Sequence, residues 1–195
     1  MKKGEKRKQE LLKIAYDLFL SKGYENTSVD FIIEEAGIAK GTFYYYFESK
    51  EQLLEEVCMM MIEEQSENAK HFLEEDYTIP QKLIGIISSF RPSGDEQTRG
   101  EALHRPENLL MHDKIKHKII EALQPIVTEV AEEGIRDGIF NCDNVPERVR
   151  IILIVSNTLF DDYSFTERDV IVFIDLIEKL LGAEPGTMSF IKELI

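Results

Sequence analysis

The sequence predicts an all-α protein with an N-terminal three-helix helix-turn-helix head, joined by a continuous helix to a larger C-terminal helical domain. Three observations predict this fold: apolar residues recur at helical spacing along most of the chain, capping residues and glycines divide the N-terminal region into short helices, and the apolar pattern continues without a break beyond the last of these. The expected domains are residues 1–48 and residues 49–195.

The first helix of the head is expected to end at Gly23, because glycine readily adopts the left-handed conformation that closes a helix. Its apolar residues keep the spacing of one helical face, and they are Leu11, Ile14, Ala15, Leu18 and Phe19. This helix would support the two that follow.

The second helix is expected to begin at a cap formed by Thr27, with Asp30 completing a T-x-x-D box. Gly37 ends it, and the chain then turns toward the next helix. The apolar stripe that would face the core consists of Val29, Ile32, Ile33 and Ala36.

The third helix begins near Lys40 and is short, because Ser49 and Gln52 form an S-x-x-Q cap that opens another helix. At about 100° per residue, Phe43 and Phe47 share one face of this third helix. Roughly opposite lie Gly41, Thr42 and Tyr45. The phenylalanines would therefore anchor the helix, while the other face could reach phosphates and base edges in a major groove. The alternative is that the three tyrosines merely cover a core.

These residues resemble the TetR family of bacterial repressors, whose N-terminal signature is similar to TTV-x-x-IA-x-x-AGVS-x-GTLYYYF-x-SKE-x-L. The match runs from about Leu12 to Leu54 and has no gaps after Thr27. The resemblance implies contacts to bases and phosphates from Lys40, Gly41, Thr42, Tyr44 and Tyr45. It implies contacts that hold the DNA backbone from Thr27, Ser28, Tyr46 and Lys50. The chain departs from the signature at Ile33, where the family has Ala, and at Ala39, where a Ser often caps the recognition helix.

The net charge of −14 is distributed unevenly along the 195 residues. Residues 1–47 contain eight Lys or Arg and seven Asp or Glu, so they carry +1 and the rest of the chain carries −15. The N-terminal tail contains five basic side chains within residues 2–8, which suits contact with phosphates, although a solvated tail is an equal alternative. The acidic remainder would favour docking with the basic end toward the duplex.

The composition also predicts where the protein works. No segment approaches the roughly 20 apolar residues of a membrane span, and no secretory signal follows the N-terminal lysines, so we expect a cytoplasmic protein without a membrane partner. Cys58 and Cys142 lack metal-ligand spacing and are expected to be reduced thiols in the core.

The apolar stripe after the head extends one long helix to about Glu75, and a short helix is expected after Pro80. A loop at residues 91–94 and a weakly patterned region to Asn108 would follow. A long helix begins at Leu109, ends between residues 134 and 138, and would bend at Pro125. Two strongly apolar helices are expected at residues 146–160 and 167–181, before a last amphipathic turn at the C-terminus.

Family resemblance places the last two helices in a two-fold dimer interface, although a purely intramolecular core would show the same periodicity. It also places a ligand pocket in the C-terminal domain, for which the candidate lining residues are Met61, Ile87, Leu123, Val127 and Asn157. A compound bound between the helix from Ser49 and the helix around Pro125 would change the separation of the two heads.

We therefore expect a ligand-responsive transcriptional regulator: a homodimeric repressor that binds a palindromic DNA operator and is released by an unknown small molecule. A regulator controlled only by a protein partner and a small-molecule sequestering protein with a vestigial head are the alternatives. No catalytic or cofactor motif occurs, so no enzyme and no cofactor are expected. His104, His112 and His117 lie near acidic residues, but their spacing fits no familiar ligand set, so no metal is expected.

Overall fold

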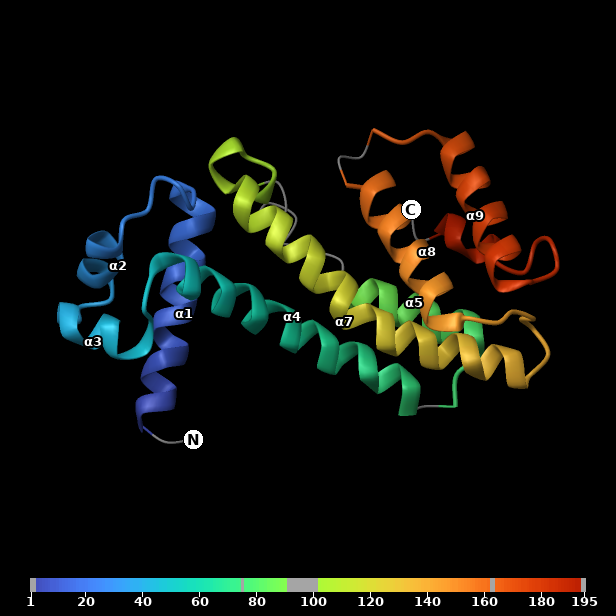
Figure 1. Ribbon diagram of the computed structural model, residues 1–195, viewed down its shortest axis with the longest axis horizontal. Helices are drawn as coiled ribbons and strands as arrows, with labels where there is room; N and C mark the ends of the chain where they lie inside the picture. Colours follow the sequence, from blue (N-terminus) through green and yellow to red (C-terminus); the bar gives the residue numbers. More distant parts are fainter. Residues whose placement is uncertain (1–2, 75, 91–101, 162–163, 194–195) are drawn as a thin grey trace. The chain divides into compact units, whose positions relative to one another are not determined.

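The computed structural model describes residues 3–74, 76–90, 102–161 and 164–193, and these residues contain eight α-helices and no β-strand. In chain order the helices are α1 (Lys3–Lys22), α2 (Val29–Glu35), α3 (Lys40–Tyr46), α4 (Lys50–Glu74), α5 (Ile79–Ser89), α7 (Leu109–Arg136), α8 (Val145–Leu159) and α9 (Glu167–Leu181) (Figure 1). The described residues also contain two 3₁₀ turns, η1 (Pro106–Asn108) and η2 (Ser189–Glu193). The predicted all-α fold is confirmed.

The chain forms two compact units. The first consists of Met1–Glu63 with Pro92–Lys118, and the second consists of Glu64–Arg91 with Ile119–Ile195. The boundaries between them fall inside α4 and α7, so each of these helices contributes residues to both units.

The first unit contains the helix-turn-helix head. α2 packs against both α1 and α3, and Figure 1 shows the two short helices α2 and α3 beside α1. Its core consists of fully buried side chains from every helix of the unit, including Ala15, Phe19, Ile32, Phe43, Phe47, Leu53, Leu54 and Val57. Burial of this many large apolar groups is the main force that holds short helices such as α2 and α3, since seven-residue helices are not stable alone in water.

The second unit packs α5, α8 and α9 with the later parts of α4 and α7. Gly85 of α5 lies directly beneath the ring of Phe72, and a Cβ at this position would lie 2.2 Å from that ring. The pair α8 and α9 lie side by side (Figure 1), and Phe160 meets Phe173 edge to face with ring centroids 5.2 Å apart. After α9, Met188 and Ile191 are buried and hold the C-terminal turn η2 against the unit, which is one of the arrangements that the sequence left open.

One ion pair of the second unit joins two of its helices and is largely shielded from solvent. The ammonium group of Lys82 donates to both carboxylate oxygens of Glu133, at 2.8 and 2.7 Å, and only 7% of the Lys82 side chain is exposed. The pair links α5 to α7, and its ammonium group is largely removed from water while Glu133 stays partly exposed.

Most predicted helix limits are confirmed, and the small differences have local causes. α5 begins at Ile79 rather than after Pro80, because Thr78 caps it and the Thr78 N–H and hydroxyl both donate to Gln81 Oε1 at 3.0 Å. α8 begins one residue earlier than predicted, at Val145. Pro125 lies inside α7 as predicted. The loop predicted at residues 91–94 lies outside the described residues.

Two further expectations concern burial and hydropathy. Cys58 is buried in the core, but Cys142 is only half-buried, so the prediction that both thiols are core residues is wrong for Cys142. Among the described residues, no helix is both long enough and apolar enough to span a bilayer.

Candidate nucleic-acid interface

The turn between α2 and α3 has the geometry of a Schellman motif. The Ile38 N–H donates to the Ile33 carbonyl at 3.2 Å, and the Gly37 N–H donates to the Glu34 carbonyl at 3.0 Å. Gly37 has φ of 59°, which is the left-handed region predicted for this residue. The turn is therefore closed by its own backbone and fixes the direction in which α3 leaves it.

The cap of α2 is Ser28, not Thr27 as predicted. The Ser28 hydroxyl accepts a hydrogen bond from the Phe31 N–H at 3.1 Å. Thr27 is fully buried, and its hydroxyl donates to the Gly23 carbonyl at 2.7 Å. The prediction failed because adjacent Thr and Ser both satisfy the cap pattern, and the long-range fold of the turn at Gly23 decides between them.

The third helix has the predicted amphipathic arrangement. Phe43 and Phe47 are fully buried, whereas Tyr45 is 79% exposed and Tyr44 is 50% exposed. Gly41 is also exposed, and a Cβ at this position would meet no atom within 4 Å. One face of α3 is thus anchored by two phenyl rings, and its other face presents backbone and phenol groups to solvent.

Lys40, at the start of α3, forms an exposed ion pair with Asp30 of α2, with Nζ 3.0 Å from Oδ1. The hydrogen bond that Lys40 donates to Asp30 and the charge of that carboxylate both raise the pKa of Lys40. A side chain that the sequence assigns to DNA is therefore held by a neighbouring carboxylate within the head.

Lys50, at the start of α4, is directed at the turn after α1. Its ammonium group donates to the Tyr24 carbonyl at 3.0 Å and lies 4.1 Å from the centroid of the Tyr24 ring. Burial, with the charges of Glu51 and Glu25, raises the pKa of the Tyr24 phenol to about 12, so this ring stays neutral. In this structure Lys50 stabilises the head internally.

The predicted cap of α4 is present. The Gln52 N–H donates to the Ser49 hydroxyl at 3.1 Å, and the Gln52 side chain accepts from the Glu48 N–H at 2.6 Å. This arrangement differs from a standard capping box because the side chain of the Gln reaches one residue further back. It fixes the chain directly after α3.

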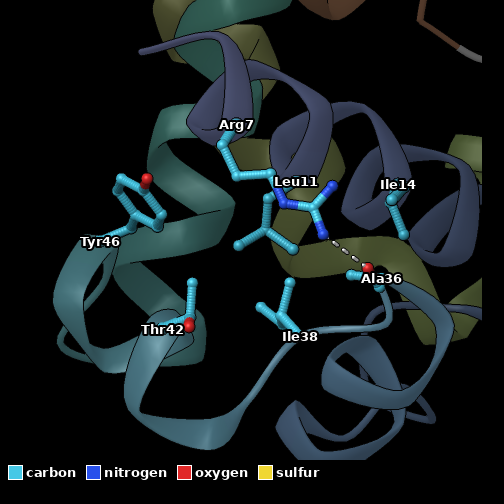
Figure 2. Close-up of a pocket in the computed structure, with 7 residues that line it drawn as sticks. All are labelled: Arg7, Leu11, Ile14, Ala36, Ile38, Thr42 and Tyr46. Atoms are coloured by element: carbon cyan, nitrogen blue, oxygen red, sulfur yellow. Dashed lines mark hydrogen bonds between the residues drawn. The ribbon is translucent and has the colours of Figure 1, made fainter. Parts of the chain in front are cut away.

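Thr42 and Tyr46, two further predicted DNA contacts, are half-buried and line a shallow hollow between α1 and α3 (Figure 2). Arg7 lies at the edge of this hollow, where its guanidinium group donates to the Ala36 carbonyl at 3.2 Å and to Glu10 at 2.9 Å. Ala36 is the C-cap of α2, so Arg7 satisfies a carbonyl that the helix itself leaves without a donor.

The sequence did not identify two polar residues that support the head. The sequence places Arg7 only in a basic tail. Its bond to Ala36 could not be predicted, because the two residues are 29 positions apart in the sequence. Asn108 is fully buried and accepts from the Tyr24 N–H at 2.7 Å, across 84 residues of sequence. Nothing near Asn108 in the sequence indicates this partner, because its region is polar and weakly patterned.

The five candidate ligand residues do not belong to one unit. Met61 lies in the first unit, and the other four lie in the second. Leu123 is buried, whereas Ile87, Val127 and Asn157 are half-buried on α5, α7 and α8. Their role in binding a ligand stays a prediction.

Comparisons with known proteins agree with this geometry. Residues 11–57 match the family model of bacterial regulatory proteins of the tetR family, and residues 91–173 match that of the tetracyclin repressor-like C-terminal domain. A search of curated proteins gave no match.

Solved structures share the fold at low sequence identity. A tetR-family transcriptional regulator from Syntrophomonas wolfei is 22% identical, with a TM-score of 0.61 over 97% of this chain and 95% of its own. The fatty acid degradation regulator FadR from Bacillus halodurans is 21% identical, with a TM-score of 0.63 over 93% and 97%. RolR without ligand is 18% identical, with a TM-score of 0.69 over 95% of both chains.

Two family models match different parts of the chain, and the third helix of the head has an exposed outer face. The chain therefore belongs to the TetR family of DNA-binding transcription regulators, which are not enzymes.

Proposed function

We propose that the protein is a homodimeric repressor that binds a palindromic operator through α3 and leaves it when a small molecule binds the C-terminal part of the chain. The observation that carries this proposal is the two-sided character of α3, in which Phe43 and Phe47 are buried while Tyr44 and Tyr45 are exposed. A helix held in this way can enter a major groove without disturbing the core beneath it. We assign residues 1–48 to DNA binding and residues 49–195 to ligand binding and dimerisation.

Exposed apolar side chains on the last two helices support the dimer. Ile151 and Ile154 of α8 are almost half exposed, as is Ile171 of α9, and Val172 is 65% exposed. Each helix already buries one face inside the second unit, so these side chains form additional apolar surface that a second copy would cover. A two-fold dimer presents two copies of α3, which is what a palindromic operator requires.

A small-molecule effector is supported by the fold. RolR has been solved in complex with resorcinol, and that structure superposes on this chain with a TM-score of 0.67 over 95% of it. We assign the effector to the predicted residues of the second unit, which are Ile87, Leu123, Val127 and Asn157; the fifth predicted residue, Met61, belongs to the first unit. The compound must bind the conformation that has left the operator more tightly than the operator-bound conformation. Equal affinity for both would not change the equilibrium between them.

The test begins with selection of bound duplexes from a random pool, followed by fluorescence anisotropy on the selected sequence and on a scrambled one. We expect Tyr45→Ala to lose about 1–3 kcal/mol of binding at the selected sequence, because an exposed base contact is removed. Lys40→Ala should weaken both duplexes equally and lower the salt slope by about 1, because a phosphate contact is removed. Tyr77→Ala, which removes an exposed tyrosine outside the head, should change neither.

Absence of binding to any duplex at low salt would contradict the proposal and favour a sequestering protein with a vestigial head. Selection of a site without two-fold symmetry would contradict the dimeric arrangement alone. These two outcomes are distinguishable because the first abolishes affinity and the second changes only the form of the site.

A further inference from the structure

Two histidines that are eight residues apart in the sequence converge in the first unit. His104 lies in the turn before η1 and His112 lies in the first turns of α7. Their ring centroids are 4.5 Å apart with planes tilted by 54°, and one ring nitrogen of each lies within 4.8 Å of one from the other. His104 is exposed and His112 is half-buried, so a hydrated ion from solvent can reach both rings.

The backbone that carries the two rings is fixed by a buried side chain. Asn108 lies midway between them, is fully buried, and donates from Nδ2 to the Ala102 carbonyl at 2.9 Å. Its own N–H donates to the Arg105 carbonyl at 2.9 Å, and neighbouring Met111 is also fully buried. A pair of ligands mounted on a fixed turn loses little conformational freedom when it binds an ion.

We propose that His104 and His112 form a binding site for a divalent transition-metal ion of the zinc class. Imidazole nitrogen is a borderline ligand that suits Zn²⁺, Ni²⁺ and Cu²⁺, whereas Mg²⁺ and Ca²⁺ require oxygen ligands. Two imidazoles supply half of a tetrahedral zinc shell, and water or other donors complete it. His117 does not converge with these two rings, and its Nδ1 lies 2.9 Å from the Asp113 carbonyl oxygen on its own helix.

The same turn is bonded to the DNA-binding head, which gives the site a consequence within the first unit. Asn108 Oδ1 accepts from the Tyr24 N–H at 2.7 Å, and the Glu107 carbonyl accepts from the Glu25 N–H at 3.1 Å. An ion held by both histidines closes residues 104–112 into a loop around Asn108. It therefore opposes local opening of this turn and slows exchange of the Tyr24 amide hydrogen.

Calorimetric titration of the full chain with ZnCl₂ tests the site, and the visible absorption of Co²⁺ reports coordination directly. We expect one ion per chain in the wild type, and loss of that ion in His104→Ala and in His112→Gln, a variant that keeps side-chain volume at the half-buried position. His117→Ala is the matched control from the same helix and should bind as the wild type does. MgCl₂ should give no signal.

Hydrogen exchange at the Tyr24 amide supplies a second readout. Zinc should slow it in the wild type and in His117→Ala, and should leave it unchanged in His104→Ala. The proposal is overturned if the wild type binds no zinc, or if His104→Ala and His112→Gln bind it as the wild type does. Either result would mean that the two rings only pack against each other. Thermal melts without metal establish that each variant is folded.

Discussion

At the scale of single residues, Asp30 restrains a cation that the sequence assigns to DNA. The Lys40–Asp30 pair is exposed, so water and salt weaken it and a phosphate can compete with it. A phosphate that binds Lys40 must displace the Asp30 carboxylate and also approach its negative charge. We therefore expect Asp30 to lower the general affinity of the head for nucleic acid.

We expect Asp30→Asn to raise affinity for a scrambled duplex by about three- to tenfold at low salt and to steepen its salt dependence, because Lys40 becomes available to phosphate. Fluorescence anisotropy at several salt concentrations measures both quantities. Glu35→Gln removes one negative charge from the same helix without removing the bond to Lys40, and should have a smaller effect. Equal gains in the two variants would show that net charge alone is responsible.

Another residue-scale property is the acidity of the buried thiol. Burial raises the pKa of Cys58 from 9.0 to about 12, so the folded protein keeps this group protonated at a pH where the unfolded chain ionises it. The contribution of the protonated Cys58 thiol to the free energy of unfolding is complete below pH 9. Between pH 9 and about pH 12 the free energy of unfolding falls by about 1.4 kcal/mol per pH unit, because only the unfolded chain loses this proton.

Urea unfolding in reducing buffer at successive pH values between 8 and about 11 tests this expectation. The free energy of unfolding should fall with pH less steeply in Cys58→Ala than in the wild type, whatever the absolute cost of the cavity. Cys142→Ala should leave the slope closer to that of the wild type, because Cys142 is only half-buried. Identical slopes in all three proteins would contradict the assignment.

At the scale of helices, two glycines end their helices with nearly the same backbone conformation but different surroundings. Gly37 after α2 and Gly182 after α9 have φ of 59° and 63°. A Cβ at Gly37 would meet no atom within 4 Å, whereas a Cβ at Gly182 would lie 2.1 Å from the Asn141 carbonyl oxygen. Substitution at Gly37 therefore introduces backbone strain alone, whereas substitution at Gly182 introduces the same strain together with a steric clash.

We expect Gly37→Ala to lower the free energy of unfolding by about 1–2 kcal/mol, because an L-residue with a side chain is strained in the left-handed conformation. Gly182→Ala should cost about 1–3 kcal/mol more, because the backbone of Asn141 must also move. Thermal or urea unfolding measures both, and equal losses would show that the Asn141 segment yields without cost. Operator affinity of Gly37→Ala, measured in parallel, reports whether the turn tolerates the change.

Helices are also the scale at which the sequence was most informative. The limits of α3 and α9 were predicted closely because caps, glycines and apolar spacing act within a few residues of each other. The outward face of α3 followed from the same periodicity. The partners of Lys50 and Asn108 could not be predicted, because their bonds to the turn at Tyr24 span 26 and 84 residues and depend on the completed fold.

At the scale of the whole molecule, the proposed dimer depends on apolar side chains of α8 and α9. We expect Ile154→Lys combined with Val172→Lys to give a monomer in light scattering, because two charges would be buried in the interface. Operator affinity should fall at least about a hundredfold, because the two heads would no longer be joined. Leu109→Lys alters a side chain that is 60% exposed in the first unit, and should leave both properties unchanged. A dimeric double variant would contradict the assigned interface.

The Lys82–Glu133 pair within the second unit constrains how this protein can diverge. Loss of Glu133 alone leaves the buried Lys82 ammonium without its counter-charge, whereas buried ion pairs replaced on both sides by apolar groups of similar volume are often neutral or stabilising. We therefore expect positions 82 and 133 to change together during evolution. Among relatives that keep α5 and α7 in register, positions 82 and 133 should carry either both charges or neither.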